Sequence, residues 1–307
     1  MGKFLIKISF YIFGIIAVLM LLASYADGNT DDNYMHFAVE KPKNIILGDS
    51  RSVQGIVPEV LKNKLSTPFD NFSLNIAQSP YGEIYLKALK RKLASDTQNG
   101  IFIITVNPWN LSLKNDVLTK ADYPEEKSPF KNMYFYNMSP NYEYLLKNLN
   151  KSWFRIYFDR EAVVRSKSFL HKDGWMEVTV DMNKDSVNAR IAKKTQEYQL
   201  MLNNYKLSEV RMKALNDIID YLQPKGTVYL VRIPATQNIM NLENKRFPEF
   251  SGLMRDLSRK RNIKFYDFSG RCDDFVYTDG NHMYKGSSKV LTAQIADSIQ
   301  ADRRQLK

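Results

Sequence analysis

The sequence predicts an α/β fold, a three-layer sandwich in which helices cover both faces of a parallel β-sheet. Short apolar runs alternate with longer segments whose apolar residues recur at helical spacing, which indicates repeated strand–helix–strand units. The strand-like runs are apolar throughout, as expected for strands that are buried on both faces. With 307 residues, 44% of them hydrophobic, the chain is long enough for one large domain with attachments.

The first half of the predicted sheet contains three strands. Residues 44–47, NIIL, form a short buried strand, and residues 57–65 form a helix that tolerates a proline in its first turn. Residues 71–77 are predicted as the second strand. A helix over 81–95 follows, with an apolar side made of Ile84, Leu86, Leu89 and Leu93. The run GIFIITV, residues 100–106, is the central strand.

The second half repeats this alternation. A helix over 210–223 is stopped by the sequence Pro-Lys-Gly, and TVYLVRI at 227–233 forms the fourth strand. A helix over 249–261, a strand over 263–268 and a final helix over 287–300 complete the chain.

An insertion at about 114–205 separates the third and fourth strands, because the alternation breaks there. It is rich in aromatic and charged residues and is expected to be helical and irregular, lying over one edge of the sheet. It contains one hairpin-like stretch, Asp173–Asp181. The predicted organisation is a membrane segment over 1–26, a polar linker over 27–43 and a domain over 44–307 that includes the insertion.

The N-terminus predicts passage of the chain into or across a membrane. Lys3 and Lys7 precede a charge-free run of 19 residues from Ile8 to Ala26, close to the length that spans a bilayer as a helix. Acidic residues follow the run, so the N-terminus is expected to stay cytoplasmic and the bulk of the chain to lie outside. The run is either an uncleaved signal anchor or a signal peptide cleaved after Ala26. Its length exceeds a usual signal core and favours the single-pass anchor.

Charge and composition limit the classes of partner and ligand that we expect for this chain. The formal net charge of +11 favours anionic neighbours, such as lipid headgroups or an anionic or glycan polymer. Nucleic acid is not expected, because the sequence has no zinc-ligand spacing, aromatic RNA-binding signature or concentrated basic tract. The single Cys272 excludes an intrachain disulfide and a cysteine-based metal site. No cofactor and no metal are predicted.

Ser50 is a candidate nucleophile. It lies in the stretch NIILGDSRSV, just past the first predicted strand, and sites in open α/β sheets form outside the carboxyl ends of strands. Gly48 allows a tight turn there, and the backbone N–H groups after Ser50 can face a developing oxyanion. The alternative is a polar strand-to-helix turn with no chemistry.

His282 is the candidate base. Asp279 lies three residues before it in a loop ahead of the last helix, so its carboxylate can turn back to the imidazole Nδ1 and leave Nε2 free for a serine proton. The alternative is a capping aspartate beside a solvated histidine. His36 in the linker and His171 in the insertion are both expected to be solvated.

Gly48-Asp49-Ser50 near the start and Asp279-x-x-His282 near the end resemble the first and last blocks of the SGNH/GDSL hydrolase superfamily. The resemblance implies a flavodoxin-like sandwich and a Ser-His-Asp triad. It also implies oxyanion donors after the second and third strands, for which Gly82, or alternatively Ser79, and Asn107 are the candidates beside the Ser50 N–H. The surroundings of these residues depart from the usual family pattern, since Gly82 lies late and Asn107 precedes a proline.

The layout is similar to membrane-anchored envelope proteins of D-alanine transfer and alginate O-acetyl transfer. That similarity implies a serine esterase or acyltransferase that acts on a cell-envelope polymer, with a membrane-bound acyltransferase as a possible partner. Hydrolysis and transfer are both open, and so are two further readings: a catalytically inactive scaffold and a phospholipid lipase. Arg51 and Arg232 are candidate substrate-binding residues, because a guanidinium matches a carboxylate or phosphate, although each also suits a packing role.

Overall fold

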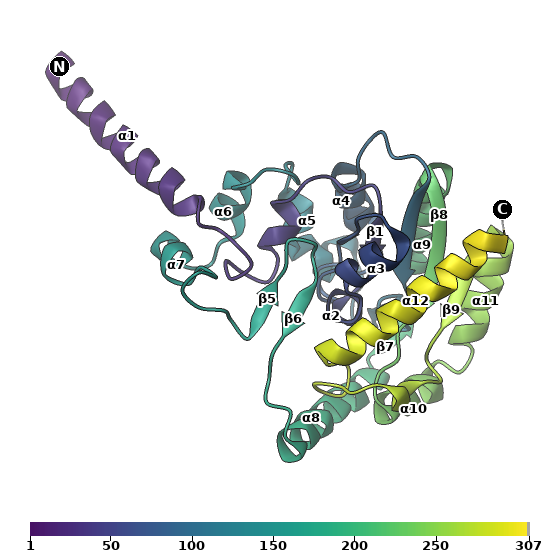
Figure 1. The fold of residues 1–307 in the computed structure, drawn as a ribbon. Coiled ribbons are helices and arrows are strands. Elements are labelled where there is room, and N and C mark those ends of the chain that lie inside the picture. The colour runs from purple at the N-terminus through teal and green to yellow at the C-terminus, as the bar shows by residue number, and fades with distance from the viewer. Residues whose placement is uncertain (306–307) are drawn as a thin grey trace.

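Five parallel strands form the central sheet of the computed structural model, which describes residues 1–305. Their spatial order is β2 (Asp70–Asn71), β1 (Ile45–Leu47), β3 (Gly100–Thr105), β8 (Gly226–Arg232) and β9 (Lys264–Asp267). Numbered only among themselves, these strands run 2-1-3-4-5, the flavodoxin-like order of doubly wound sheets. The predicted α/β sandwich is confirmed (Figure 1).

Helices cover both faces of the sheet, which explains why the strands are apolar throughout. Ile45 and Leu47 of β1 pack into the core on one face, and Ile46 packs into the core on the other. The Ile46 face is covered by α3 (Pro58–Leu65) and α12 (Lys285–Gln305), and the short helix α2 (Ser50–Gly55) at the end of β1 contacts α12. The opposite face is covered by α4 (Glu83–Lys92), α9 (Glu209–Leu222) and α11 (Phe250–Arg261).

The segment between β3 and α9 is held at its base by an antiparallel pair, β4 (Ser112–Lys114) with β7 (Tyr205–Leu207). Its helices are α5 (Pro129–Asn132), α6 (Tyr142–Asn148), α7 (Trp153–Phe158) and α8 (Lys184–Leu202). A second pair, β5 (Ser168–Leu170) with β6 (Met176–Val178), forms the hairpin. The first strand of this hairpin lies before the predicted stretch, and α10 (Gln237–Arg246) follows β8 without having been predicted.

The second strand is shorter than predicted. β2 ends at Asn71, and beyond Phe72 the chain turns, because the Leu74 N–H is bound by the Ser79 hydroxyl at 3.0 Å. The predicted polar linker is also partly wrong. Its residues Tyr34–Phe37 form a 3-10 turn that packs into the core, and this carries His36 to 0% exposure, where a solvated ring had been predicted.

Helix α1 (Gly2–Ala23) projects away from the sandwich (Figure 1). It is the one helix in residues 1–305 that is long and apolar enough to cross a membrane, and nearly all of it is exposed. These properties fit a single-pass anchor. The side of the membrane on which the domain lies stays a prediction.

Candidate active site

Ser50 begins α2 at the carboxyl end of β1, between β2 and β3. The Asp49 carboxylate caps this helix by accepting a hydrogen bond from the Arg51 N–H at 3.0 Å. A Cβ atom at Gly48 would collide with the side chains of Thr105 and Ser52, so glycine is required by close packing of the turn against β3. This local structure holds Ser50 at the edge of the sheet.

Ser50, His282 and Asp279 form a continuous hydrogen-bonded series. The Ser50 Oγ lies 2.9 Å from the His282 Nε2. The His282 Nδ1 lies 3.0 Å from one Asp279 carboxylate oxygen and 3.2 Å from the other. Because a carboxylate only accepts hydrogen bonds, it places the imidazole proton on Nδ1 and leaves Nε2 as the acceptor for the serine hydroxyl.

The Asp279 carboxylate also builds the loop that carries the histidine. One of its oxygens accepts the backbone N–H groups of Asn281 at 2.7 Å and His282 at 2.8 Å, an Asx turn. The Thr278 N–H donates to the His282 carbonyl at 2.9 Å and closes the turn. Burial opposes ionisation of Asp279, but the hydrogen bonds from the His282 ring and from the backbone N–H groups of Asn281 and His282 hold the pKa of this carboxyl well below its usual range.

The series opens into a cavity of about 430 Å³, named here the Ser50 cavity. Its wall includes Asp32 from the segment after α1, Met176 and Val178 from the hairpin, and Arg190 from α8. The Arg190 Nε donates to the Thr278 carbonyl at 2.6 Å, which ties α8 to the histidine loop. Sequence reasoning missed these residues, because neither the segment after α1 nor the insertion has a sequence pattern that shows which part returns to the sheet.

Asn107 lies at the end of β3, as predicted, but its amide is already engaged. The Asn107 Nδ2 donates to the Asp49 carboxylate at 2.6 Å, and its Oδ1 accepts the N–H groups of Trp109 and Asn110. The residue is 3% exposed and does not line the Ser50 cavity. In this arrangement the amide ties two strand ends together and is not free to bind an oxyanion.

Gly82 and Ser79, the other predicted donors, also lie off the cavity. Gly82 precedes α4 and packs against the side chains of Arg211 and Glu125. The Ser79 hydroxyl donates to the Gly48 carbonyl at 2.7 Å. The wall beside Ser50 is formed instead by Ser73–Asn75. The Ser50 N–H itself belongs to the first helical residue, whose N–H has no partner within the helix, so it is available for an oxyanion.

Arg51 and Arg232 were predicted to bind substrate, and the structure gives both another partner. Both guanidinium groups contact the buried Glu243 of α10, at 2.5 Å from Arg51 and 3.1 Å from Arg232, and neither lines the Ser50 cavity. The Trp109 Nε1 donates to the same carboxylate at 2.7 Å. Burial disfavours the Glu243 anion, yet the two arginines lower the pKa of this carboxyl. A buried arginine needs such a counter-ion, which physically explains the correction.

Asn281 links this ionic cluster to the base. Its Oδ1 accepts hydrogen bonds from the Arg51 Nε and the Tyr198 hydroxyl, both at 2.6 Å. These two donors turn the Asn281 Nδ2 toward the His282 Nε2, 3.2 Å away. The amide therefore lies beside the reacting nitrogen. Its position inside the Asp279–His282 loop was the only signal available in the sequence.

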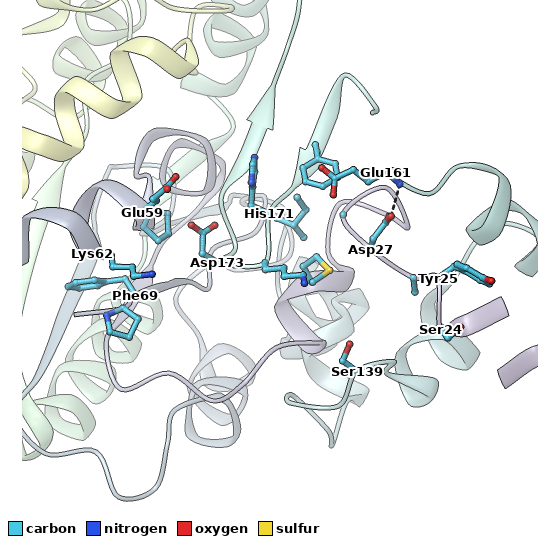
Figure 2. Close-up of a pocket in the computed structure, with 18 residues that line it drawn as sticks. Ser24, Tyr25, Asp27, Glu59, Lys62, Phe69, Ser139, Glu161, His171 and Asp173 are labelled. Carbon is cyan, nitrogen blue, oxygen red and sulfur yellow. Dashed lines mark hydrogen bonds between the residues drawn. The ribbon is translucent and has the colours of Figure 1, made fainter. Parts of the chain in front are cut away.

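A larger cavity, of about 770 Å³, lies elsewhere, between the end of α1, α3 and the hairpin (Figure 2). It includes His171, which is half-buried where a solvated ring had been predicted. The His171 Nε2 lies 3.0 Å from Glu177, and among the described residues no serine is hydrogen-bonded to this ring. Its larger size does not make it the better candidate, because within residues 1–305 a serine hydroxyl is hydrogen-bonded to a histidine ring only in the Ser50 cavity.

No protein-family model matches this chain, and no curated protein matches it. The chemical interpretation therefore depends on the geometry of the site and on the resemblance of its two end motifs.

Proposed function

We propose that this chain is a membrane-anchored serine esterase or O-acyltransferase that acts outside the cytoplasm on acyl esters of a cell-envelope polymer. The observation that carries the proposal is the series of 2.9 Å and 3.0 Å hydrogen bonds from Ser50 through His282 to Asp279. Hydrogen-bond reach between nucleophile, base and orienting carboxylate is the geometric signature of an activated serine.

In the proposed reaction, the His282 Nε2 takes the Ser50 proton as the Oγ attacks the acyl carbonyl carbon. The Ser50 N–H stabilises the oxyanion, and Asp279 stabilises the imidazolium. The ester or thioester bond then breaks, and the leaving group takes the proton from His282. Water resolves the acyl-enzyme by hydrolysis, whereas a sugar or polyol hydroxyl resolves it by transfer. The membrane segment and the basic charge favour transfer to a polymer, with a membrane-bound acyltransferase as the acyl source.

The test is covalent labelling of the full chain in detergent with a fluorophosphonate probe. The wild type is expected to react, and Ser50→Ala and His282→Ala are expected to lose the reaction. Ser168→Ala is the matched control, because Ser168 lines the same cavity without a histidine partner and should label like the wild type. Transfer is then separated from hydrolysis by following acyl release from a chromogenic ester with and without a polyol acceptor.

A second candidate is a catalytically inactive scaffold of an envelope-modification complex. The observation that favours it is the engagement of Asn107 by Asp49, which leaves the site without that oxyanion donor. If the wild-type chain is folded by circular dichroism and still fails to react with the probe, this result would support the scaffold and overturn the enzyme.

A further inference from the structure

The chain does not leave helix α1 as a free linker. Leu22 and Ala23, the last residues of α1, are buried, and the ring of Tyr25 packs edge-on against Tyr157 of α7 at 4.9 Å. A few residues later, the Asn29 Nδ2 donates to the carbonyls of Asp159 at 2.8 Å and Val164 at 2.6 Å. The α7 region is therefore attached directly to the base of the membrane helix (Figure 1).

This region exposes apolar side chains. We name it the α7 patch, and it consists of Phe154, Tyr157, Phe158, Val163 and Val164, each between 37% and 59% exposed. Five exposed apolar residues within eleven positions of a folded surface mark a contact site and not scattered surface residues. Figure 2 shows Tyr25 and Glu161 at the same end of the neighbouring cavity, and Glu161 lies between Phe158 and Val163 in the sequence, so this part of the patch segment is beside the chain leaving α1.

The chain segment that carries the patch has more positive than negative side chains. Residues 151–167 contain five Lys or Arg and two acids. The Arg160 guanidinium lies over the Tyr157 ring at 3.9 Å and over the Tyr25 ring at 5.5 Å. Aromatic rings combined with cations at the end of an apolar helix are typical of the membrane–water interface, where rings lie at headgroup level and cations face lipid phosphates.

We propose that the α7 patch rests in the headgroup region of the same bilayer that α1 spans, with lipid as its partner. Continuity with the end of α1 favours lipid, since any surface joined to this end must lie near the membrane. The positive rim matches anionic headgroups. The contact would fix the orientation of the whole domain. It would also hold the Ser50 cavity near the membrane. Two residues of the cavity wall, Asp32 and Ser168, follow Asn29 and Val164 by three or four positions in the sequence, and Asn29 and Val164 are hydrogen-bonded to each other. This inference depends on α1 spanning a bilayer and is independent of any chemistry at Ser50.

The test uses the full chain with Cys272→Ser, reconstituted into vesicles of phosphatidylcholine and phosphatidylglycerol. A single cysteine is introduced by Val164→Cys in one variant and Val290→Cys in the other, and each is labelled with an environment-sensitive fluorophore. The two positions are matched, because Val164 is 50% exposed in the patch and Val290 is 51% exposed on α12. Quenching by lipids that carry a spin label in the upper acyl chain reports insertion at the depth of interfacial side chains, about 5–10 Å.

We expect the label at position 164 to be quenched at least about twofold more than the label at position 290, and to be protected from aqueous iodide. Equal, weak lipid quenching at both positions would overturn the proposal. Protection from iodide without lipid quenching at position 164 would also overturn it, since the patch would then contact protein. Circular dichroism confirms that both labelled variants are folded. Reaction with a fluorophosphonate is scored separately, so failure of this proposal and failure of the enzymatic one are distinguishable.

Discussion

Replacing Glu243 by glutamine tests whether the buried ionic cluster supports both the fold and the base. The glutamine keeps the shape of the side chain but removes the charge that neutralises Arg51 and Arg232, whose side chains are 2% exposed. Removing one partner of a buried ion pair costs about 3–5 kcal/mol, because the remaining charge stays buried without compensation. We therefore expect Glu243→Gln to lower the free energy of unfolding by about 3–5 kcal/mol.

The chain provides a matched control for this experiment. Glu83 also pairs with two cations, Lys87 and Lys120, but its side chain is 51% exposed. Because exposed ion pairs contribute about 1 kcal/mol or less, Glu83→Gln should change stability little. Urea unfolding of the full chain in detergent, followed by tryptophan fluorescence, measures both variants. Equal losses in the two variants, or a loss below about 1 kcal/mol for Glu243→Gln, would refute the reasoning.

The same substitution has an expected effect on the site. Glu243 holds Arg51, and the Arg51 Nε holds Asn281 beside the His282 Nε2. A displacement of Arg51 would therefore move the Asn281 amide, which contacts the His282 Nε2. Under conditions where Glu243→Gln is still folded, we expect fluorophosphonate labelling to slow by about tenfold, a cost near 1.4 kcal/mol in the barrier. An unchanged labelling rate would mean that the cluster supports the fold alone.

Three further outcomes follow from named contacts. Burial and the nearby positive charge of Lys92 lower the pKa of His36 to about 3 in the folded chain. As the pH falls, the unfolded chain therefore protonates His36 before the folded chain does. The contribution of the neutral His36 to stability is thus complete above pH 6.5 and is lost at lower pH. Between pH 6.5 and pH 5, the free energy of unfolding in urea should fall by about 2 kcal/mol more for the wild type than for His36→Phe, and equal decreases would contradict this. Asp279→Asn should slow labelling by about 100-fold or more, because the imidazole loses its orienting anion, and an unchanged rate would exclude the triad. Gly48→Ala should lower the unfolding free energy by about 1–3 kcal/mol through collision with Thr105, whereas Gly252→Ala, whose Cβ meets open space, should not; similar effects at both would contradict the packing argument.

The sheet could be predicted from the sequence because a strand that is buried on both faces needs a continuous run of apolar residues, which is visible locally. The runs at 100–106 and 227–233 became β3 and β8 with shifts of one residue. The run at 71–77 looked equally strand-like, but β2 ends at Asn71 because a side-chain hydroxyl, from Ser79, takes over the backbone hydrogen bond of Leu74. That competition depends on a residue five positions away, which periodicity does not detect.

The same distinction applies to the site. The contact between Asp279 and His282 could be predicted because it is local, made within three residues by one turn. The position of Ser50 at a strand end could be predicted because sites in such sheets form there, and the sheet order brings that end beside the last loop. Part of the wall of the Ser50 cavity comes from the hairpin and α8, whose approach to the sheet is decided by tertiary packing and leaves no sequence pattern.

The two misassigned arginines show why charge alone is a poor guide to binding. A guanidinium at the end of a strand binds a substrate only when no protein carboxylate reaches it first. Arg51 and Arg232 both pair with Glu243, which lies on the unpredicted helix α10, so this carboxylate neutralises their charge within the protein. Arg190 differs, because its partners are the neutral carbonyls of Thr278 and Asp181 and its side chain lines the cavity. If an anionic substrate enters the Ser50 cavity, its charge is therefore expected to meet Arg190, and Arg51 and Arg232 would act only by holding the histidine loop in place.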